Sequence, residues 1–134
     1  MKLAALTLAA FAVLSAPAMA KVPLEDNQHI TDSLMAGRVA DVIRSTCPSI
    51  SARMVTAYSK LEDLKKYAVD QGYTEAEVKA FLKDKSQKDR IKALAADYLA
   101  KAGAVEGDVE SYCVAGRAEI DKGTLAGSML RSWK

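Results

Sequence analysis

Cysteine and histidine are the residue types best suited to metal binding and covalent catalysis, and this sequence has few of either. It contains two cysteines, Cys47 and Cys113, and a single histidine, His29. The cysteines lack C-x-x-C spacing, and an even number of cysteines in an exported chain usually means a disulfide. We therefore expect a Cys47–Cys113 bond. A pair of free thiols for metal or redox chemistry is the alternative.

The other reactive side chains form no recognisable catalytic or cofactor motif. His29 lies near the start of the predicted mature chain, where it is badly placed to be held beside a nucleophile. Zinc sites normally draw on several Cys or His ligands. Asp108 and Glu110 are the nearest approach to a carboxylate pair, and we interpret them as charges at a helix N-terminus. We expect no metal, no cofactor and no catalytic residue, and so a protein that is not an enzyme.

Residues 1–20 have the three-part layout of a cleavable secretory signal peptide. Lys2 provides the positive start, an apolar run follows over 3–14, and Ala18-Met19-Ala20 is the small-x-small pattern of a cleavage site. The run of about 12 residues is short of the roughly 20 that a spanning helix needs. We expect residues 21–134 to form one periplasmic domain with no transmembrane segment.

Charge and composition narrow the class of partner. The net charge is only +2, acidic and basic residues are interspersed, and aromatic residues make up 6% of the chain. Without a basic block, the pattern gives no sign of nucleic-acid binding. The near-neutral total also argues against strong attraction to anionic lipid.

Apolar residues recur at helical spacing through the mature part, which predicts an all-α fold. Thr74 and Glu77 form a T-x-x-E capping box, flanked by Tyr73 and Val78 as a hydrophobic staple. Ser86 and Asp89 have the spacing of a second, weaker helix cap. We expect a compact five- or six-helix bundle joined by one disulfide, with helices over 30–46, 51–71, a short segment from 74, 86–102, 108–122 and possible helix in 124–134.

Two of these helices have a predicted inward face. Ser49 or Ser51 is the expected cap of the second helix. Its apolar stripe is Ile50, Met54, Tyr58, Leu61, Leu64 and Ala68, and that of the fifth is Val109, Tyr112, Cys113, Gly116 and Ile120.

The C-terminal third contains the candidate binding residues Arg117, Glu119, Arg131 and Trp133. Gly116 costs about 1 kcal/mol relative to alanine inside a helix, so it indicates close approach of another helix. One interpretation is a tail packed internally against the disulfide, with Glu119 paired to Arg131. The other is a docking surface, since Trp and Arg are common interface anchors.

The stretch C-x-x-G-R-x-E-I-x-x-G-T-x-x-G-x-x-L-R, from Cys113 to Arg131, resembles the C-terminal signature of a family of small exported bacterial proteins of unknown function. Cys47-Pro48 and the signal peptide fit the same family. The resemblance implies a helical fold and a periplasmic address, and it carries no catalytic residues. It also suggests a gene context near the proton-pumping NADH:quinone oxidoreductase.

These observations favour a non-enzymatic accessory protein that docks on another periplasmic or membrane protein. The alternative is a periplasmic acid-stress chaperone, because protonation of the 17 carboxylates at low pH would leave a strongly positive chain that loosens by self-repulsion. A small hydrolase is the least favoured possibility.

The signal peptide gives a direct prediction. Exported protein should begin at Lys21, because Ala18-Met19-Ala20 follows the apolar run. Intact-mass measurement of protein recovered from the envelope checks this, and a mass that retains the first twenty residues would contradict it.

Overall fold

A computed structural model describes residues 21–133, so the predicted signal peptide lies outside the described residues. The predicted all-α fold is confirmed, with six α-helices in this range and one short pair of strands. In chain order the elements are η1 (Leu24–Asp26), α1 (Gln28–Thr46), β1 (Ile50–Ala52), α2 (Met54–Asp70), α3 (Glu75–Lys83), α4 (Lys85–Lys101), α5 (Val109–Lys122), α6 (Leu125–Ser128) and β2 (Leu130–Ser132).

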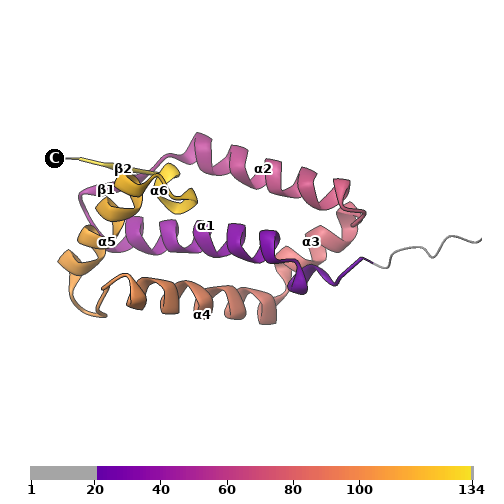
Figure 1. The fold of residues 1–134 in the computed structure, drawn as a ribbon, viewed down its shortest axis with the longest axis horizontal. Coiled ribbons are helices and arrows are strands. Elements are labelled where there is room, and N and C mark those ends of the chain that lie inside the picture. The colour runs from indigo at the N-terminus through magenta and orange to yellow at the C-terminus, as the bar shows by residue number, and fades with distance from the viewer. Residues whose placement is uncertain (1–20, 134) are drawn as a thin grey trace, which may run out of the picture.

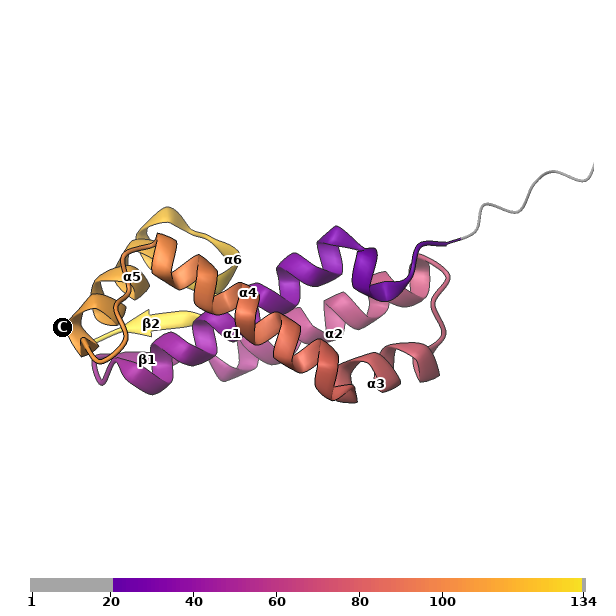
Figure 2. The ribbon, with the colours of Figure 1, turned by 90° about the horizontal axis from the view of Figure 1, so that it is seen from below.

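Helix α1 is the centre of the molecule. It lies between α2 and α4, and it also contacts α5 and α6 (Figure 1). Figure 2 shows α4 crossing α1 at an angle. Val39 and Ile43 on α1 are completely buried because the surrounding helices cover that face.

The buried side chains fall into two clusters. The larger surrounds the C-terminal half of α1, and it contains Val39, Ala40, Ile43, Cys47, Ile50, Ala95, Leu99, Cys113, Ala126, Met129 and Leu130. The smaller lies where α1 begins and α2 meets α3, and it contains Ile30, Leu64, Ala68, Tyr73 and Val78.

The predicted disulfide is confirmed. Cys47 ends α1 and Cys113 lies in α5, their Cα atoms are 5.1 Å apart, and the bond closes a loop of 66 residues. Both cysteines belong to the larger cluster. Loop-closure entropy predicts that such a bond stabilises the fold by about 4 kcal/mol.

The helix starts are partly as predicted. Thr74 caps α3 in a complete capping box with Glu77, and Asp108 caps α5. The predicted Ser86 cap is wrong. Asp84 begins α4 by accepting the N–H of Gln87, and the Ser86 hydroxyl donates to Asp84 instead.

Residues 50–52 are not the start of a helix, which corrects the prediction for 51–71. They form β1, which pairs antiparallel with β2, Ser51 opposite Arg131. The N–H of Trp133 extends the pairing by donating to the carbonyl of Ser49 at 2.7 Å. Neither Ser49 nor Ser51 caps α2, whose N-cap is Arg53. Strands of three residues are too short to show an alternating pattern, and each needs a partner some 80 residues away.

The predicted inward faces of α2 and α5 are each wrong in part. Met54 and Tyr58, at the beginning of α2, are each 66% exposed, and Val109 on α5 is also exposed. Leu64 and Ala68, farther along α2, are buried as predicted. At this end of α2 the side chain that packs against the larger cluster is Ala57, so the inward face differs from the predicted stripe of Met54 and Tyr58.

Over residues 21–133, no helix has both the length and the apolar character needed to cross a bilayer.

Candidate functional site

The glycines of the C-terminal motif are packing positions. A Cβ on Gly116 would lie 2.5 Å from Ile50 Cδ1 and 2.6 Å from Ile43 Cγ2, so α5 approaches α1 and β1 more closely than any other residue would allow. A Cβ on Gly127 would collide with the backbone of Glu119 and Ile120. Interaction of the tail with the rest of the chain therefore explains both glycines.

Glu119 is the polar centre of this packing. Its side chain is 3% exposed, and its carboxylate accepts the Tyr98 hydroxyl at 2.9 and 3.0 Å. Thr124 donates its hydroxyl to the same carboxylate and, as N-cap of α6, accepts the N–H of Gly127. Burial, followed by the hydrogen bond to Glu119, raises the pKa of Tyr98 above its usual range. Glu119 thus joins α4, α5 and α6.

The four candidate binding residues do not form one surface. Glu119 is inside, so the predicted Glu119–Arg131 ion pair is wrong. The reason is that Tyr98 and Thr124 already satisfy the carboxylate. Arg117 pairs with Glu110 at 2.5 Å. Arg131 and Trp133 do lie together, with the Arg131 guanidinium 5.6 Å from the Trp133 ring centre, and both are exposed.

A mainly apolar groove of about 620 Å³ runs between α1 and α2, and Leu125 and Met129 also line it. Its α1 wall extends from His29 to Arg44 and its α2 wall from Met54 to Leu64. At 1.5 Å per residue, the α1 wall is roughly 22 Å long. Arg38, Arg44 and Lys60 stand among the lining residues, as do Asp41 and Asp63.

Gly37 lies in the middle of the α1 wall, and sequence reasoning missed it. A Cβ built on Gly37 meets no atom within 4 Å, in contrast to Gly116 and Gly127. A glycine in the middle of a helix lowers stability relative to alanine, and no close contact within the described chain explains why this position is a glycine. The signal was available, because the argument that singled out Gly116 applies equally to Gly37.

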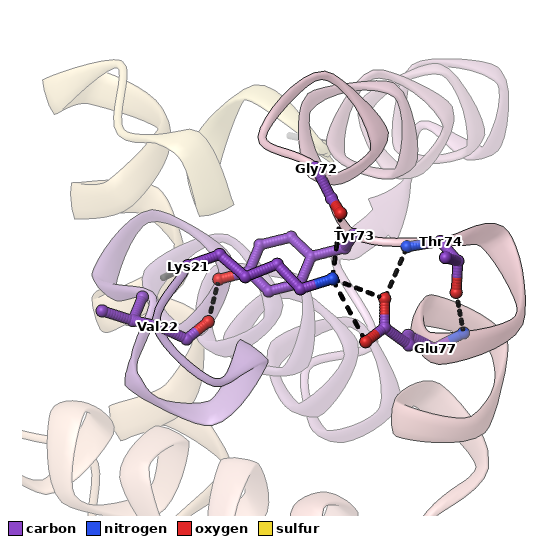
Figure 3. A network of polar contacts seen from close by, with 6 residues as sticks. All are labelled: Lys21, Val22, Gly72, Tyr73, Thr74 and Glu77. Atoms are coloured by element: carbon purple, nitrogen blue, oxygen red, sulfur yellow. Dashed lines mark hydrogen bonds and ion pairs between the residues drawn. The ribbon is translucent and has the colours of Figure 1, made fainter. Parts of the chain in front are cut away.

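A polar network fixes the beginning of the described chain to the corner between α2 and α3 (Figure 3). The ammonium of Lys21 donates to the carbonyl of Gly72 at 2.9 Å and to both oxygens of Glu77, and it lies 5.1 Å from the Tyr73 ring centre. The Tyr73 hydroxyl donates to the carbonyl of Val22 at 2.5 Å. Two segments about 50 residues apart in sequence, 21–22 and 72–77, therefore meet here.

Glu77 is the acceptor on which this network depends. The N–H of Thr74 donates to it at 2.6 Å, and the Thr74 hydroxyl accepts the N–H of Glu77. The bond from the Thr74 N–H, followed by that from the Lys21 ammonium, lowers the pKa of Glu77 to about 2.

No part of the described chain gathers three or more His, Cys, Asp or Glu side chains in a way that could hold a metal ion. His29 packs against Tyr67, with ring centres 4.3 Å apart, and lines the groove.

The model of a family of unknown function, DUF5333, matches residues 22–131. The chain belongs to this family. The matched region contains the disulfide, the groove and the whole C-terminal motif, so the expected membership of an uncharacterised family is confirmed. No curated protein and no solved structure matches the chain significantly.

The burial of Glu119 gives a prediction about the motif. Glu119→Ala should lower the free energy of unfolding by about 2 kcal/mol, because it removes a buried carboxylate and leaves the half-buried hydroxyls of Tyr98 and Thr124 without their charged acceptor. Urea unfolding followed by circular dichroism measures this. Glu110→Ala, which removes only exposed charge interactions at the start of the same helix, is the matched control and should cost less than about 1 kcal/mol. Equal effects would contradict the assignment.

Proposed function

We propose that this protein is a non-enzymatic accessory protein of the bacterial envelope, and that it docks on another envelope protein through the groove between α1 and α2. The observation that carries the proposal is Gly37, an open glycine in the middle of an apolar groove. The disulfide supports an oxidising compartment such as the periplasm, where such bonds persist.

The dimensions of the groove suit one helix of a partner. A wall of roughly 22 Å matches about four helical turns, and docking an apolar helix face in such a groove is a common recognition mode. Gly37 would let the partner's helix approach the α1 backbone closely. Leu34, Leu61 and Met129 supply apolar contacts around it.

The charged side chains around the groove indicate which charge the partner's helix should carry on its polar side. Arg38 and Arg44 both pair with Asp41, at 2.9 and 2.6 Å, so one carboxylate is shared between two cations. Neither Lys60 nor Asp63 forms an ion pair with another described residue. The three cations therefore exceed the two carboxylates by one charge, so the rim is complementary to a helix whose polar flank is weakly acidic.

Substitution of Gly37 separates docking from folding. Gly37→Leu should raise the free energy of unfolding by about 1 kcal/mol, because the site is open and leucine favours helix more than glycine does. It should also fill the groove and reduce partner capture at least ten-fold. Capture is measured by quantitative mass spectrometry of proteins retained from envelope extract by the tagged protein.

Gly37→Ala is the matched control. It should give the same gain in stability with a smaller loss of capture, because a methyl group obstructs the groove less than an isobutyl group. If the leucine variant is folded and still retains the same proteins as wild type, docking in the groove is wrong.

A second candidate function, an acid-stress chaperone, is supported by the Glu77 network. The pKa of Glu77 is about 2 in the folded protein and near 4.5 when unperturbed. Its contribution to stability is therefore complete above about pH 4.5 and is lost as the pH falls toward 2. Protonation would release Lys21 and open the corner over the apolar cluster of Tyr73 and Val78.

Glu77→Gln tests this mechanism, because it keeps an oxygen that can cap Thr74 but removes the titrating charge. The variant should lose less stability than wild type between about pH 4.5 and pH 2, measured by urea unfolding at each pH. Glu75→Gln, in the same helical turn, is the control and should behave as wild type. For a chaperone, wild type should also suppress aggregation of an acid-denatured test protein, and failure to do so would exclude this candidate.

A further inference from the structure

The acidic residues are unevenly distributed along the chain, although the whole sequence is close to neutral. Residues 42–61 contain Arg44, Arg53 and Lys60 and no Asp or Glu. Residues 122–133 contain Lys122 and Arg131 and again no Asp or Glu. The pairing of β1 with β2 brings these two segments together at one end of the molecule (Figure 1).

Among residues 21–133, the three most exposed large apolar side chains, Val55, Met54 and Tyr58, lie at this end. Val55 is 87% exposed, Met54 and Tyr58 are each 66% exposed, and Trp133 is 57% exposed. A hollow lined by 52–56 and Arg131 joins the beginning of α2 to β2, and Arg131 stacks on Trp133. We call this surface the sheet end and define it by Arg53, Val55, Tyr58, Arg131 and Trp133.

A hydrogen bond to β1 holds the Trp133 side chain of the sheet end in place. The Trp133 indole N–H donates to the Ser51 hydroxyl at 2.9 Å, and Arg131 lies opposite Ser51 in the strand pair. Arg53 donates to the carbonyl of Ser128 and forms no ion pair with any other described side chain. Arg53, Val55 and Arg131 therefore line one hollow, Trp133 lies beside Arg131, and Tyr58 follows Val55 by about one turn of α2.

Carboxylates on neighbouring elements do not cancel this charge. On α5, which packs against β2, Glu110 is paired with Arg117 and Glu119 is buried. Asp121, also on α5, offsets the charge of its sequence neighbour Lys122, so the excess positive charge of 122–133 is that of Arg131. Asp41 on α1 is occupied by Arg38 and Arg44.

We propose that the sheet end binds the anionic phospholipid surface of a membrane, with Trp133, Tyr58 and Val55 among the headgroups and Arg53 and Arg131 against lipid phosphates. Tryptophan and tyrosine prefer the bilayer interface, and exposed Lys and Arg are drawn to anionic lipid. Protruding side chains without a deep pocket suit a fluid surface better than a shaped protein partner. This proposal goes beyond the proposed function because it uses a different surface from the groove.

Trp133 is the single tryptophan of the chain, so its fluorescence reports on the sheet end alone. Protein purified after expression of the full chain, with its mass determined, is mixed with vesicles of equal parts phosphatidylglycerol and phosphatidylcholine. The emission should shift to shorter wavelength, and the protein should sediment with the vesicles. Vesicles of phosphatidylcholine alone should bind at least ten-fold more weakly, and about 1 M salt should weaken binding to the anionic vesicles.

Charge-matched variants locate the binding. Arg53→Glu with Arg131→Glu should weaken binding at least ten-fold, since each basic residue near an anionic surface contributes about five-fold. Lys88→Glu with Lys92→Glu, on the exposed side of α4, makes the same change in net charge and should have less than a three-fold effect. Both variants are first checked for native unfolding behaviour.

Three outcomes would overturn the proposal. The first is that wild-type protein fails to bind the anionic vesicles. The second is that the two double variants bind equally, which would assign binding to net charge or to an uncleaved leader. A Trp133 shift with polyglutamate but none with vesicles would instead assign the sheet end to an acidic protein. Capture by the groove is measured separately with Gly37→Leu, so failure of one proposal leaves the other standing.

Discussion

The close approach of α5 to α1 is the contact on which the C-terminal half of the molecule depends. Gly116 allows it, because any side chain there would collide with Ile43 and Ile50, and the Cys47–Cys113 bond holds it covalently one turn away. With α5 in this position, Gly127 can pack on its backbone and Glu119 is enclosed by Tyr98 and Thr124. The chain then returns as β2 beside β1, which creates the sheet end.

The helices could be predicted from sequence because their signals are local. The capping box at Thr74, the hydrophobic staple beside it and the apolar spacing along the helices all act within a few residues. The β1–β2 pair could not, since neither strand is long enough to show a pattern and the partner is far away in sequence. The exposure of Met54 and Tyr58 escaped for a related reason. Spacing shows that a face is apolar, but only the arrangement of helices shows whether anything covers it.

For the candidate sites too, features set by local sequence could be predicted and features set by the arrangement of the helices could not. The Cys47–Cys113 pair and the structural need for Gly116 followed from residue type and context. The role of Glu119 could not be predicted in this way. Its carboxylate accepts hydrogen bonds from Tyr98, on another helix, and from Thr124, and it does not pair with Arg131. Likewise, a net charge of +2 describes the whole chain but conceals the separation of charge at the sheet end. That separation exists only because two segments without carboxylates are paired in space.

The pairing of Ile50–Ala52 with Leu130–Ser132 also affects when the fold can form. During synthesis, β1 has no partner until roughly eighty further residues have been made, and Cys47 waits 66 residues for Cys113. Long-range contacts of this kind slow folding, because the intervening loop must close before they form. A chain whose first core helix is completed only by its later segments cannot close its larger core until those segments exist. If the predicted signal peptide directs export, this delay would favour the unfolded state in which a chain crosses a secretion channel.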